Sequence, residues 1–83
     1  MQPETTKKEV TIFSTPTCHF CQMAKEFFKE KGIQYTEHNV VADVAERQRM
    51  VEISGQLGVP VIIIGNDVVV GFNRERVEGL LGV

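Results

Sequence analysis

The 83-residue chain is long enough for one compact domain and too short for a second hydrophobic core. Its net charge of -2 comes from acidic and basic residues mixed along the sequence, which gives no field that would attract nucleic acid or an anionic membrane. The polar start at 1–9 lacks the apolar core of a signal peptide, and no apolar stretch could span a bilayer. We therefore expect a cytoplasmic protein without nucleic-acid or membrane partners, with a flexible segment at 1–9 and a single domain at 10–83.

The first predicted elements are a strand and a helix. The stretch 10–13, Val-Thr-Ile-Phe, is rich in β-branched and aromatic residues, and the Ser-Thr-Pro-Thr sequence that follows it breaks the strand. Apolar residues then recur at helical spacing from 18 to 31, and Gly32 stands where a left-handed cap would end a helix. We expect Met23, Phe27 and Phe28 of this helix to lie in the core.

A second strand and a second helix follow. Residues 33–41 alternate in character and predict a strand that frays near Asn39. Asp43 can cap a helix that runs to about Ile53, and Gly55 can end it.

The last third of the chain predicts a hairpin and a short helix. The apolar run 61–64 fits a strand buried on both faces, 65–67 is a turn, and 68–70 is the partner strand. Asn73 can cap a helix over 74–81 whose apolar residues are Val77, Leu80 and Leu81. The order β-α-β-α-β-β-α, with a right-handed first crossover, predicts an α/β fold with a four-stranded mixed sheet and helices on both faces.

The two cysteines, Cys18 and Cys21, are too few for the disulfide framework of a small secreted domain. They lie where the first strand ends and the first helix begins, so the helix N-terminus favours a thiolate on Cys18. Cys21 lies three residues later on the same helix face, close enough to complete a disulfide. We predict that Cys18 attacks a target disulfide and that Cys21 then resolves the mixed disulfide.

Other interpretations of the two cysteines remain open. They could be buried small hydrophobic residues, or half of a metal site, although a structural zinc site needs four ligands and only His19 and the distant His38 are available. We therefore predict no metal site. A further alternative is a scaffold in which Cys18, with outside thiols, holds an iron–sulfur cluster between two subunits, and Cys21 disfavours it by promoting disulfide closure. A third alternative is a redox-inert adaptor that keeps only the fold, which the presence of both thiols at a helix start disfavours. Lys25 lies one turn beyond Cys21 and could support the Cys21 thiolate, but we interpret it as an exposed lysine on a solvated helix face.

These features resemble the glutaredoxin family from about Val10 to Val83. The resemblance is carried by a strand followed by Thr-Pro-Thr-Cys-His-Phe-Cys, a Gly-Val-Pro before an apolar strand, and a Gly-Phe before the last helix. It implies a thioredoxin-like fold with three helices and a thiol–disulfide oxidoreductase that acts on disulfide-containing proteins or small disulfides without a bound cofactor. We separately expect the protein to be a monomer. It also implies that Pro60 is cis and faces the cysteine pair, with the backbone of Val59 offered to an extended thiol substrate.

Five further residues are candidate substrate contacts. Residues between the cysteines lie beside both sulfurs, and the two aromatic residues could form a hydrophobic docking rim. The candidates are Thr17, His19, Phe20, Gly71 and Phe72.

The chain departs from glutathione-using glutaredoxins at three places. Thr15 stands where those proteins usually have a basic residue, Val70-Gly71 replaces a Gly-Gly pair, and Asn73-Arg74 replaces an acidic pair. The Val-Gly-Phe-Asn-Arg stretch looks more like the redoxins that take electrons from thioredoxin reductase, including those that serve ribonucleotide reductase. The electron donor is therefore expected to be either glutathione or a thioredoxin reductase.

Overall fold

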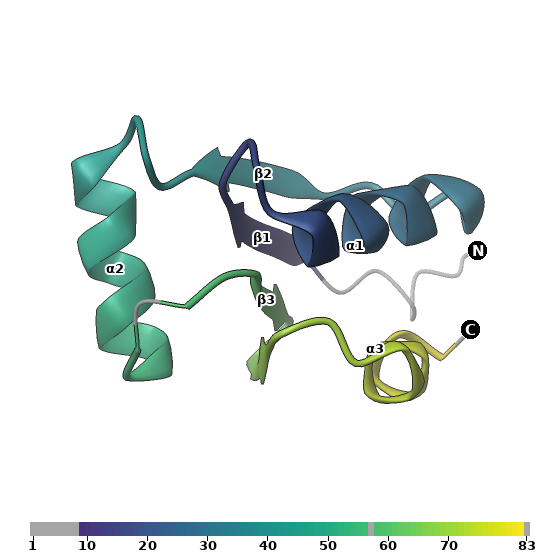
Figure 1. Ribbon diagram of the computed structural model, residues 1–83. Helices are drawn as coiled ribbons and strands as arrows, with labels where there is room; N and C mark the ends of the chain where they lie inside the picture. Colours follow the sequence, from purple (N-terminus) through teal and green to yellow (C-terminus); the bar gives the residue numbers. More distant parts are fainter. Residues whose placement is uncertain (1–8, 57, 83) are drawn as a thin grey trace.

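The computed structural model describes residues 9–56 and 58–82, which form one sheet with helices on both of its faces (Figure 1). The element order matches the predicted β-α-β-α-β-β-α arrangement. The predicted flexible segment at 1–9 lies outside the described residues except for Glu9, whose backbone carbonyl accepts a hydrogen bond from the Gly65 amide. The elements are β1 (Val10–Ser14), α1 (His19–Glu30), β2 (Thr36–Asn39), α2 (Val44–Ser54), β3 (Val61–Ile64), β4 (Asp67–Val70) and α3 (Arg74–Leu81).

The four strands form a mixed sheet in the order β2-β1-β3-β4. Strand β2 runs parallel to β1, as the right-handed crossover through α1 requires, and Ser14 pairs with Asn39 at the end of both strands. Strand β3 is antiparallel to β1 and pairs with β4 across the turn at Gly65 and Asn66. The predicted four-stranded mixed sheet is therefore confirmed, with β1 and β3 at its centre.

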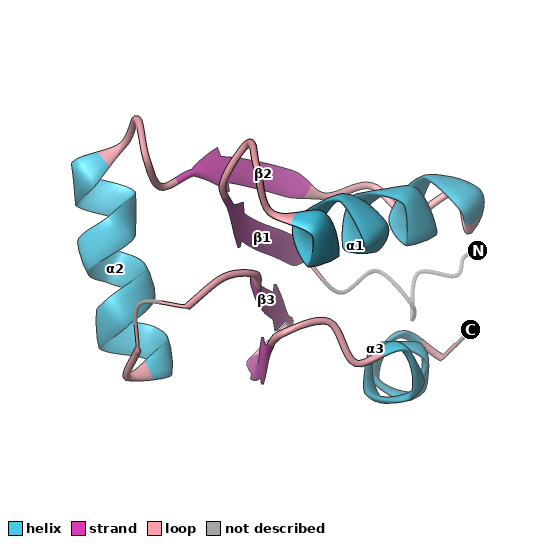
Figure 2. Ribbon diagram, viewed as in Figure 1, coloured by secondary structure: helices cyan, strands magenta, loops and turns pink. Residues whose placement is uncertain are grey.

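Each face of the sheet has its own core. Successive strand residues point to opposite faces, so Ile12 contributes to one core and Phe13 to the other. Helices α1 and α3 cover one face, and α2 covers the opposite face (Figure 2). The larger core contains Val10, Ile12, Ala24, Phe27, Phe28, Ile62, Ile64, Val69, Val77 and Leu81, and the smaller one contains Phe13, Val40, Met50 and Val61.

The predicted helix ends are confirmed by their capping groups. The side chains of Asp43 and Asn73 accept hydrogen bonds from the backbone amides of Glu46 and Arg76, each at 3.1 Å, so both act as N-caps. Gly55 has a φ of 78°, a left-handed conformation that suits glycine and lets its amide bond back to the carbonyl of Val51.

The structure corrects two details of the sequence-based prediction. Strand β2 begins at Thr36 rather than residue 33 and ends at Asn39, because the Asn39 side chain turns the chain by accepting hydrogen bonds from the amides of Val41 and Ala42. Met23 was predicted to be in the core, but it is 38% exposed. The buried stripe of α1 runs through Cys21, Ala24, Phe27 and Phe28, and Met23 lies on its border, one turn from the exposed Phe20.

Within residues 9–56 and 58–82, none of the helices has the length and apolar character needed to cross a membrane.

Candidate functional site

Cys18 lies at the N-terminus of α1 and caps the helix with its own side chain. Its backbone is extended, its amide donates to the carbonyl of Thr15, and its sulfur accepts a hydrogen bond from the amide of Cys21 at 3.2 Å. The positive end of the helix dipole lies at the same place, and both features stabilise negative charge on Cys18 Sγ. The side chain is partly exposed, so a substrate can reach the sulfur. This is a suitable environment for a nucleophilic thiolate.

Cys21 is completely buried, although it lies only one helical turn from Cys18. Burial, followed by the hydrogen bond with Cys18, raises the pKa of the Cys21 thiol from 9.0 to about 12, while a hydrogen bond from the Thr15 backbone and the charge of Lys25 act in the opposite direction. The Cys21 thiol is therefore protonated at neutral pH. The two free thiols therefore have different environments. Cys18 is accessible and its sulfur accepts a hydrogen bond from a backbone amide, whereas the Cys21 thiol is buried and neutral.

The peptide bond between Val59 and Pro60 is cis, as the resemblance implied. The carbonyl of Val59 lies 3.8 Å from Cys18 Sγ, within reach of a weak hydrogen bond from the thiol, and the Pro60 side chain is buried. The amide of Gly71 donates to the Pro60 carbonyl at 2.8 Å. The fold therefore brings Cys18, Val59, Pro60 and Gly71 together from distant parts of the sequence.

The other candidate contacts occupy two different surroundings. Thr17, His19 and Phe20 are exposed next to Cys18, and the His19 and Phe20 rings meet edge to face with centroids 5.7 Å apart. Phe72 instead packs against the larger core, with its ring centroid 5.8 Å from that of Phe27. A role in substrate contact remains a prediction for all four residues.

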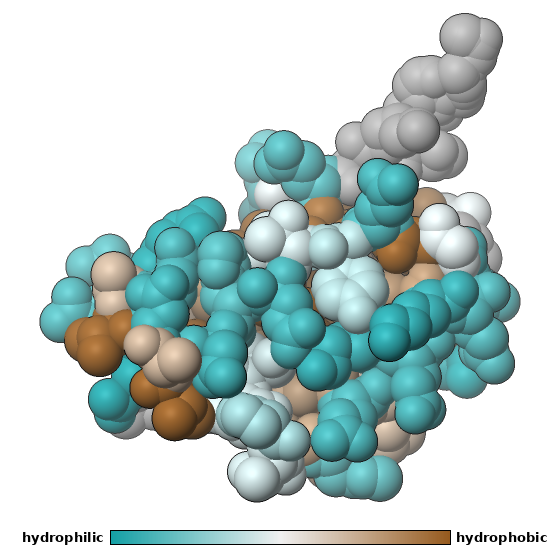
Figure 3. All heavy atoms as spheres, turned by 90° about the horizontal axis from the view of Figure 1, so that it is seen from above, coloured by the Kyte–Doolittle hydropathy of each residue, from teal (hydrophilic) through white to brown (hydrophobic). Residues whose placement is uncertain are grey.

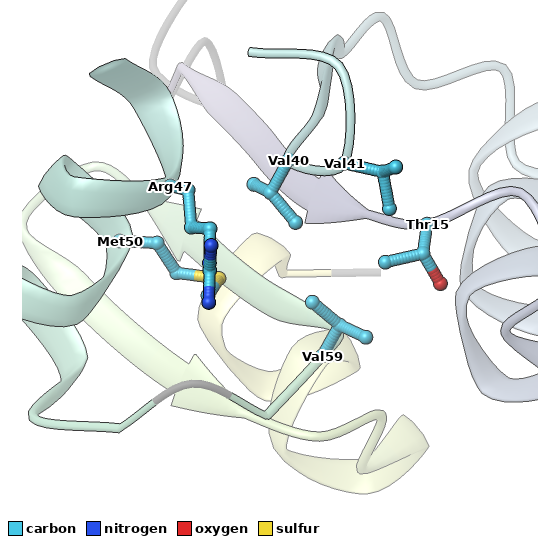
Figure 4. Close-up of a pocket in the computed structure, with 6 residues that line it drawn as sticks. All are labelled: Thr15, Val40, Val41, Arg47, Met50 and Val59. Atoms are coloured by element: carbon cyan, nitrogen blue, oxygen red, sulfur yellow. The ribbon is translucent and has the colours of Figure 1, made fainter. Parts of the chain in front are cut away.

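A hollow of about 330 Å³ lies beside this site, and the sequence reasoning missed most of its wall. In Figure 4, side chains from α2, from the loop after β1 and from the loop before Pro60 face one another across it. Arg47 supplies its only charged side chain among the described lining residues. Arg47 stands three residues from both Val44 and Met50, on the apolar period of the helix, but only the folded structure shows that its side chain borders a hollow. The lining residues are Thr15, Val40, Val41, Arg47, Met50 and Val59.

Exposed apolar residues lie close to this hollow in the chain, since Val41 lines it and Val44 follows three residues later. Figure 3 shows apolar atoms gathered at the end of the molecule where α2 lies, on a face that is otherwise largely polar. Val41 and Val44, in the turn before α2 and in its first turn, are among the most exposed large apolar residues. Such a patch beside a reactive thiol is typical of a docking surface.

Lys25 is paired rather than freely solvated, which corrects its interpretation as an exposed surface lysine. Its side chain is 23% exposed, and its Nζ donates to Glu37 Oε2 at 2.8 Å. The same oxygen accepts a hydrogen bond from the buried hydroxyl of Ser14 at 2.9 Å. Glu37 lies on β2, so this ion pair joins α1 to the sheet close to Cys21.

In the part of the chain that the structure describes, no three His, Cys, Asp or Glu side chains are grouped to hold a metal ion. The cluster-scaffold alternative would use Cys18 with thiols from outside the chain, and it stays a prediction.

The raised pKa of Cys21 predicts a specific loss of stability at high pH. Because the folded state holds the Cys21 proton more tightly than the unfolded state, this stability is fully present below pH 9 and is lost as the pH rises towards 12. The free energy of unfolding of the reduced protein should therefore fall by up to about 1.4 kcal/mol per pH unit over that range. Urea titrations at several pH values give the free energy of unfolding of the wild type and of Cys21→Ala. The variant should lack the pH-dependent loss that Cys21 causes, and the same change of unfolding free energy with pH in both proteins would contradict the prediction.

Comparison with known proteins identifies the family. The glutaredoxin family model matches residues 10–69. A glutaredoxin-like 8.6 kDa protein from the rubredoxin operon of Clostridium pasteurianum is 43% identical over 72 residues, which cover 87% of this chain and 96% of that protein.

Solved structures agree with the sequence relatives. A glutaredoxin from Archaeoglobus fulgidus superposes with a TM-score of 0.81 at 26% identity, over 90% of this chain and 87% of that one. The glutaredoxin-like NrdH-redoxin from Escherichia coli superposes with a TM-score of 0.75 at 25% identity, over 87% and 93% of the two chains. With its thioredoxin-like fold and its redox-active Cys-x-x-Cys pair, this chain belongs to the glutaredoxin family.

Proposed function

We propose that this protein is a thiol–disulfide oxidoreductase that reduces protein or small-molecule disulfides through Cys18 and Cys21. The observation that carries the proposal is the contrast between the two thiols. Cys18 is accessible and receives an amide hydrogen bond at its sulfur, whereas Cys21 is buried and keeps its proton at neutral pH. Such a pair has one thiol suited to attack an outside disulfide and one held back for a second step.

The reaction then proceeds in two exchanges. The Cys18 thiolate attacks one sulfur of the target disulfide, forms a mixed disulfide and releases the other target sulfur as a thiolate. Cys21 loses its proton to solvent and attacks Cys18 Sγ, which breaks the mixed disulfide and releases the second target thiolate. The target has gained two electrons, and the protein holds a Cys18–Cys21 disulfide that an outside reductant must reduce.

The hollow beside Cys18 is the proposed binding place for the chain that flanks the target sulfur. Val59 lies both at Cys18 and in the wall of the hollow, so a substrate paired with its backbone would extend along this wall. Val40, Val41 and Met50 provide apolar contact, and Arg47 provides a cation for a carboxylate of the substrate. Extended peptides with an apolar or acidic residue near the cysteine fit this combination.

A thioredoxin reductase is the electron donor that we propose. Asn73 uses its side-chain oxygen to cap α3, and Arg74 pairs with Glu78 at 3.2 Å while its guanidinium lies over the Phe27 ring. These two positions therefore offer no carboxylate to the amino group of glutathione. The similar Escherichia coli NrdH-redoxin is described as having a thioredoxin-like activity profile, which supports the same assignment.

Reduction of insulin by the purified protein tests the function and the donor together. We expect turnover with NADPH and thioredoxin reductase, and little turnover with glutathione and glutathione reductase. Turnover with glutathione alone would overturn the donor assignment while keeping the oxidoreductase. Failure of both systems, together with a coloured protein that contains iron and sulfide, would overturn the oxidoreductase and support the cluster scaffold.

A further inference from the structure

The second exchange of the proposed reaction poses a problem for Cys21. Its sulfur must attack as a thiolate, yet burial, followed by the Cys18 side chain, raises the pKa of its thiol to about 12 in the reduced protein, and the burial remains when Cys18 is in the mixed disulfide. A protein can reduce this difficulty by placing a positive charge near the sulfur, because the charge stabilises the thiolate that forms.

Lys25 is the cation that the fold places there. It lies four residues after Cys21 on α1, so the two side chains are neighbours on the same helix face. The two groups influence each other electrostatically: the Lys25 charge lowers the pKa of Cys21, and Cys21 raises the pKa of Lys25. Burial and the Cys18 side chain outweigh it, so Lys25 reduces the cost of ionising Cys21 without making the resting thiol acidic.

Two residues of the sheet keep Lys25 in this position. The Lys25 side chain is drawn towards β2 by its 2.8 Å contact with Glu37 Oε2, instead of extending into solvent. The hydroxyl of Ser14, which is 1% exposed, donates to the same oxygen at 2.9 Å and so fixes the carboxylate against the end of β1. The hydrogen bond with Glu37 also raises the pKa of Lys25, so the ammonium keeps its proton at physiological pH.

The other charged and titratable groups around this arrangement are few. Glu37 faces Lys25 from β2 and is itself influenced by Lys29, one turn further along α1. Tyr35 acts on Lys25 from the segment before β2, and Cys18 acts on Cys21 from the start of α1. Lys25 is thus the cation that acts on the Cys21 sulfur, and Glu37 partly balances its charge.

We propose that Lys25, held by Glu37 and Ser14, assists the resolving step by stabilising the Cys21 thiolate as it attacks Cys18, with Glu37 and Ser14 as positioning residues. This inference rests on the proposed dithiol function. No covalent change occurs at Lys25. The proton of Cys21 leaves to solvent, the new bond joins Cys21 Sγ to Cys18 Sγ, and the electron pair of the broken mixed disulfide leaves with the target thiolate.

A chromogenic aromatic disulfide, dithiobis(nitrobenzoate), separates the two exchanges in one stopped-flow trace. The first coloured thiolate is released when Cys18 attacks, and the second when Cys21 resolves the mixed disulfide. For Lys25→Met we expect an unchanged first release and a second release slowed roughly threefold to tenfold. A higher pKa of the Cys21 thiol reduces the thiolate fraction, and the greater nucleophilicity of that thiolate offsets only part of the loss. In this variant, the rate of the second release should begin to increase at a higher pH than in the wild type.

Two matched variants identify the cause. Lys29→Met removes the same charge from the same helix two turns from Cys21, and it should leave the second release close to the wild-type rate. Lys25→Arg keeps the charge and should restore most of the rate. An unchanged second release in Lys25→Met, or an equal slowing in Lys29→Met, would overturn the role of Lys25. Absence of a first or second release in the wild type would instead overturn the proposed function.

Discussion

Replacement of Cys18 by Ser is expected to lower the rate of disulfide reduction by about a thousandfold or more. The variant lacks the only accessible thiol among the described residues, and a serine hydroxyl is a far weaker nucleophile at neutral pH. The fold should be retained, since Cys18 is only partly buried and a serine side chain is also a good N-cap. Insulin reduction with thioredoxin reductase measures the loss, and circular dichroism confirms that the variant is folded.

Cys21→Ser is the matched control for this variant. It removes one sulfur from the same pair but leaves the Cys18 thiol accessible, so the first exchange with an aromatic disulfide should continue while dithiol turnover stops. If Cys18→Ser retained the first exchange and Cys21→Ser lost it, the assignment of the two roles would be reversed.

Phe28→Ala should have the largest effect on stability. Phe28 is fully buried between α1 and the sheet, and its ring lies 5.8 Å from that of Phe27 and 5.2 Å from that of Tyr35. Removal of such a ring leaves a cavity that typically costs about 3–5 kcal/mol. Because a domain of this size has a free energy of unfolding of only about 5–15 kcal/mol, the variant should be close to unfolding at 37 °C. Urea denaturation followed by circular dichroism gives the value.

Phe20→Ala provides the comparison on the same helix. Phe20 is 56% exposed, so its truncation should change the free energy of unfolding by less than about 0.5 kcal/mol. Similar losses in both variants would show that α1 does not bury the face assigned to it. The Phe20 variant also tests the predicted docking rim, since its stability is expected to be unchanged while the KM for a protein disulfide rises.

Local signals in the sequence were sufficient to predict most of the fold. The caps Asp43 and Asn73 mark helix starts because their side chains bond to nearby backbone amides, an interaction within four residues of the chain. The apolar run of β3 is recognisable because a strand at the centre of a sheet contacts a core on each face. The position of Cys18 at a helix start follows from the same kind of local pattern.

The features that the sequence did not reveal depend on contacts between distant residues. Lys25 and Glu37 are twelve positions apart and meet only because β2 lies beside β1, next to α1. Arg47 lines the hollow because α2 crosses the other face of the sheet near Val59. Met23 has the spacing of a core residue, but the width of the buried stripe on α1 is set by how the helix sits on the sheet, which periodicity alone does not specify.

Mass spectrometry of the protein after a single encounter with a disulfide-bonded peptide tests the central claim most directly. The wild type should lose two hydrogen atoms and hold a Cys18–Cys21 disulfide, with the peptide released in reduced form. Cys21→Ser should instead carry the peptide, and peptide mapping should place the mixed disulfide on Cys18. Two results would contradict the account. One is a mixed disulfide on Cys21 in the Cys18→Ser variant that forms as fast as the one on Cys18 in Cys21→Ser. The other is a wild type that stays fully reduced beside intact substrate.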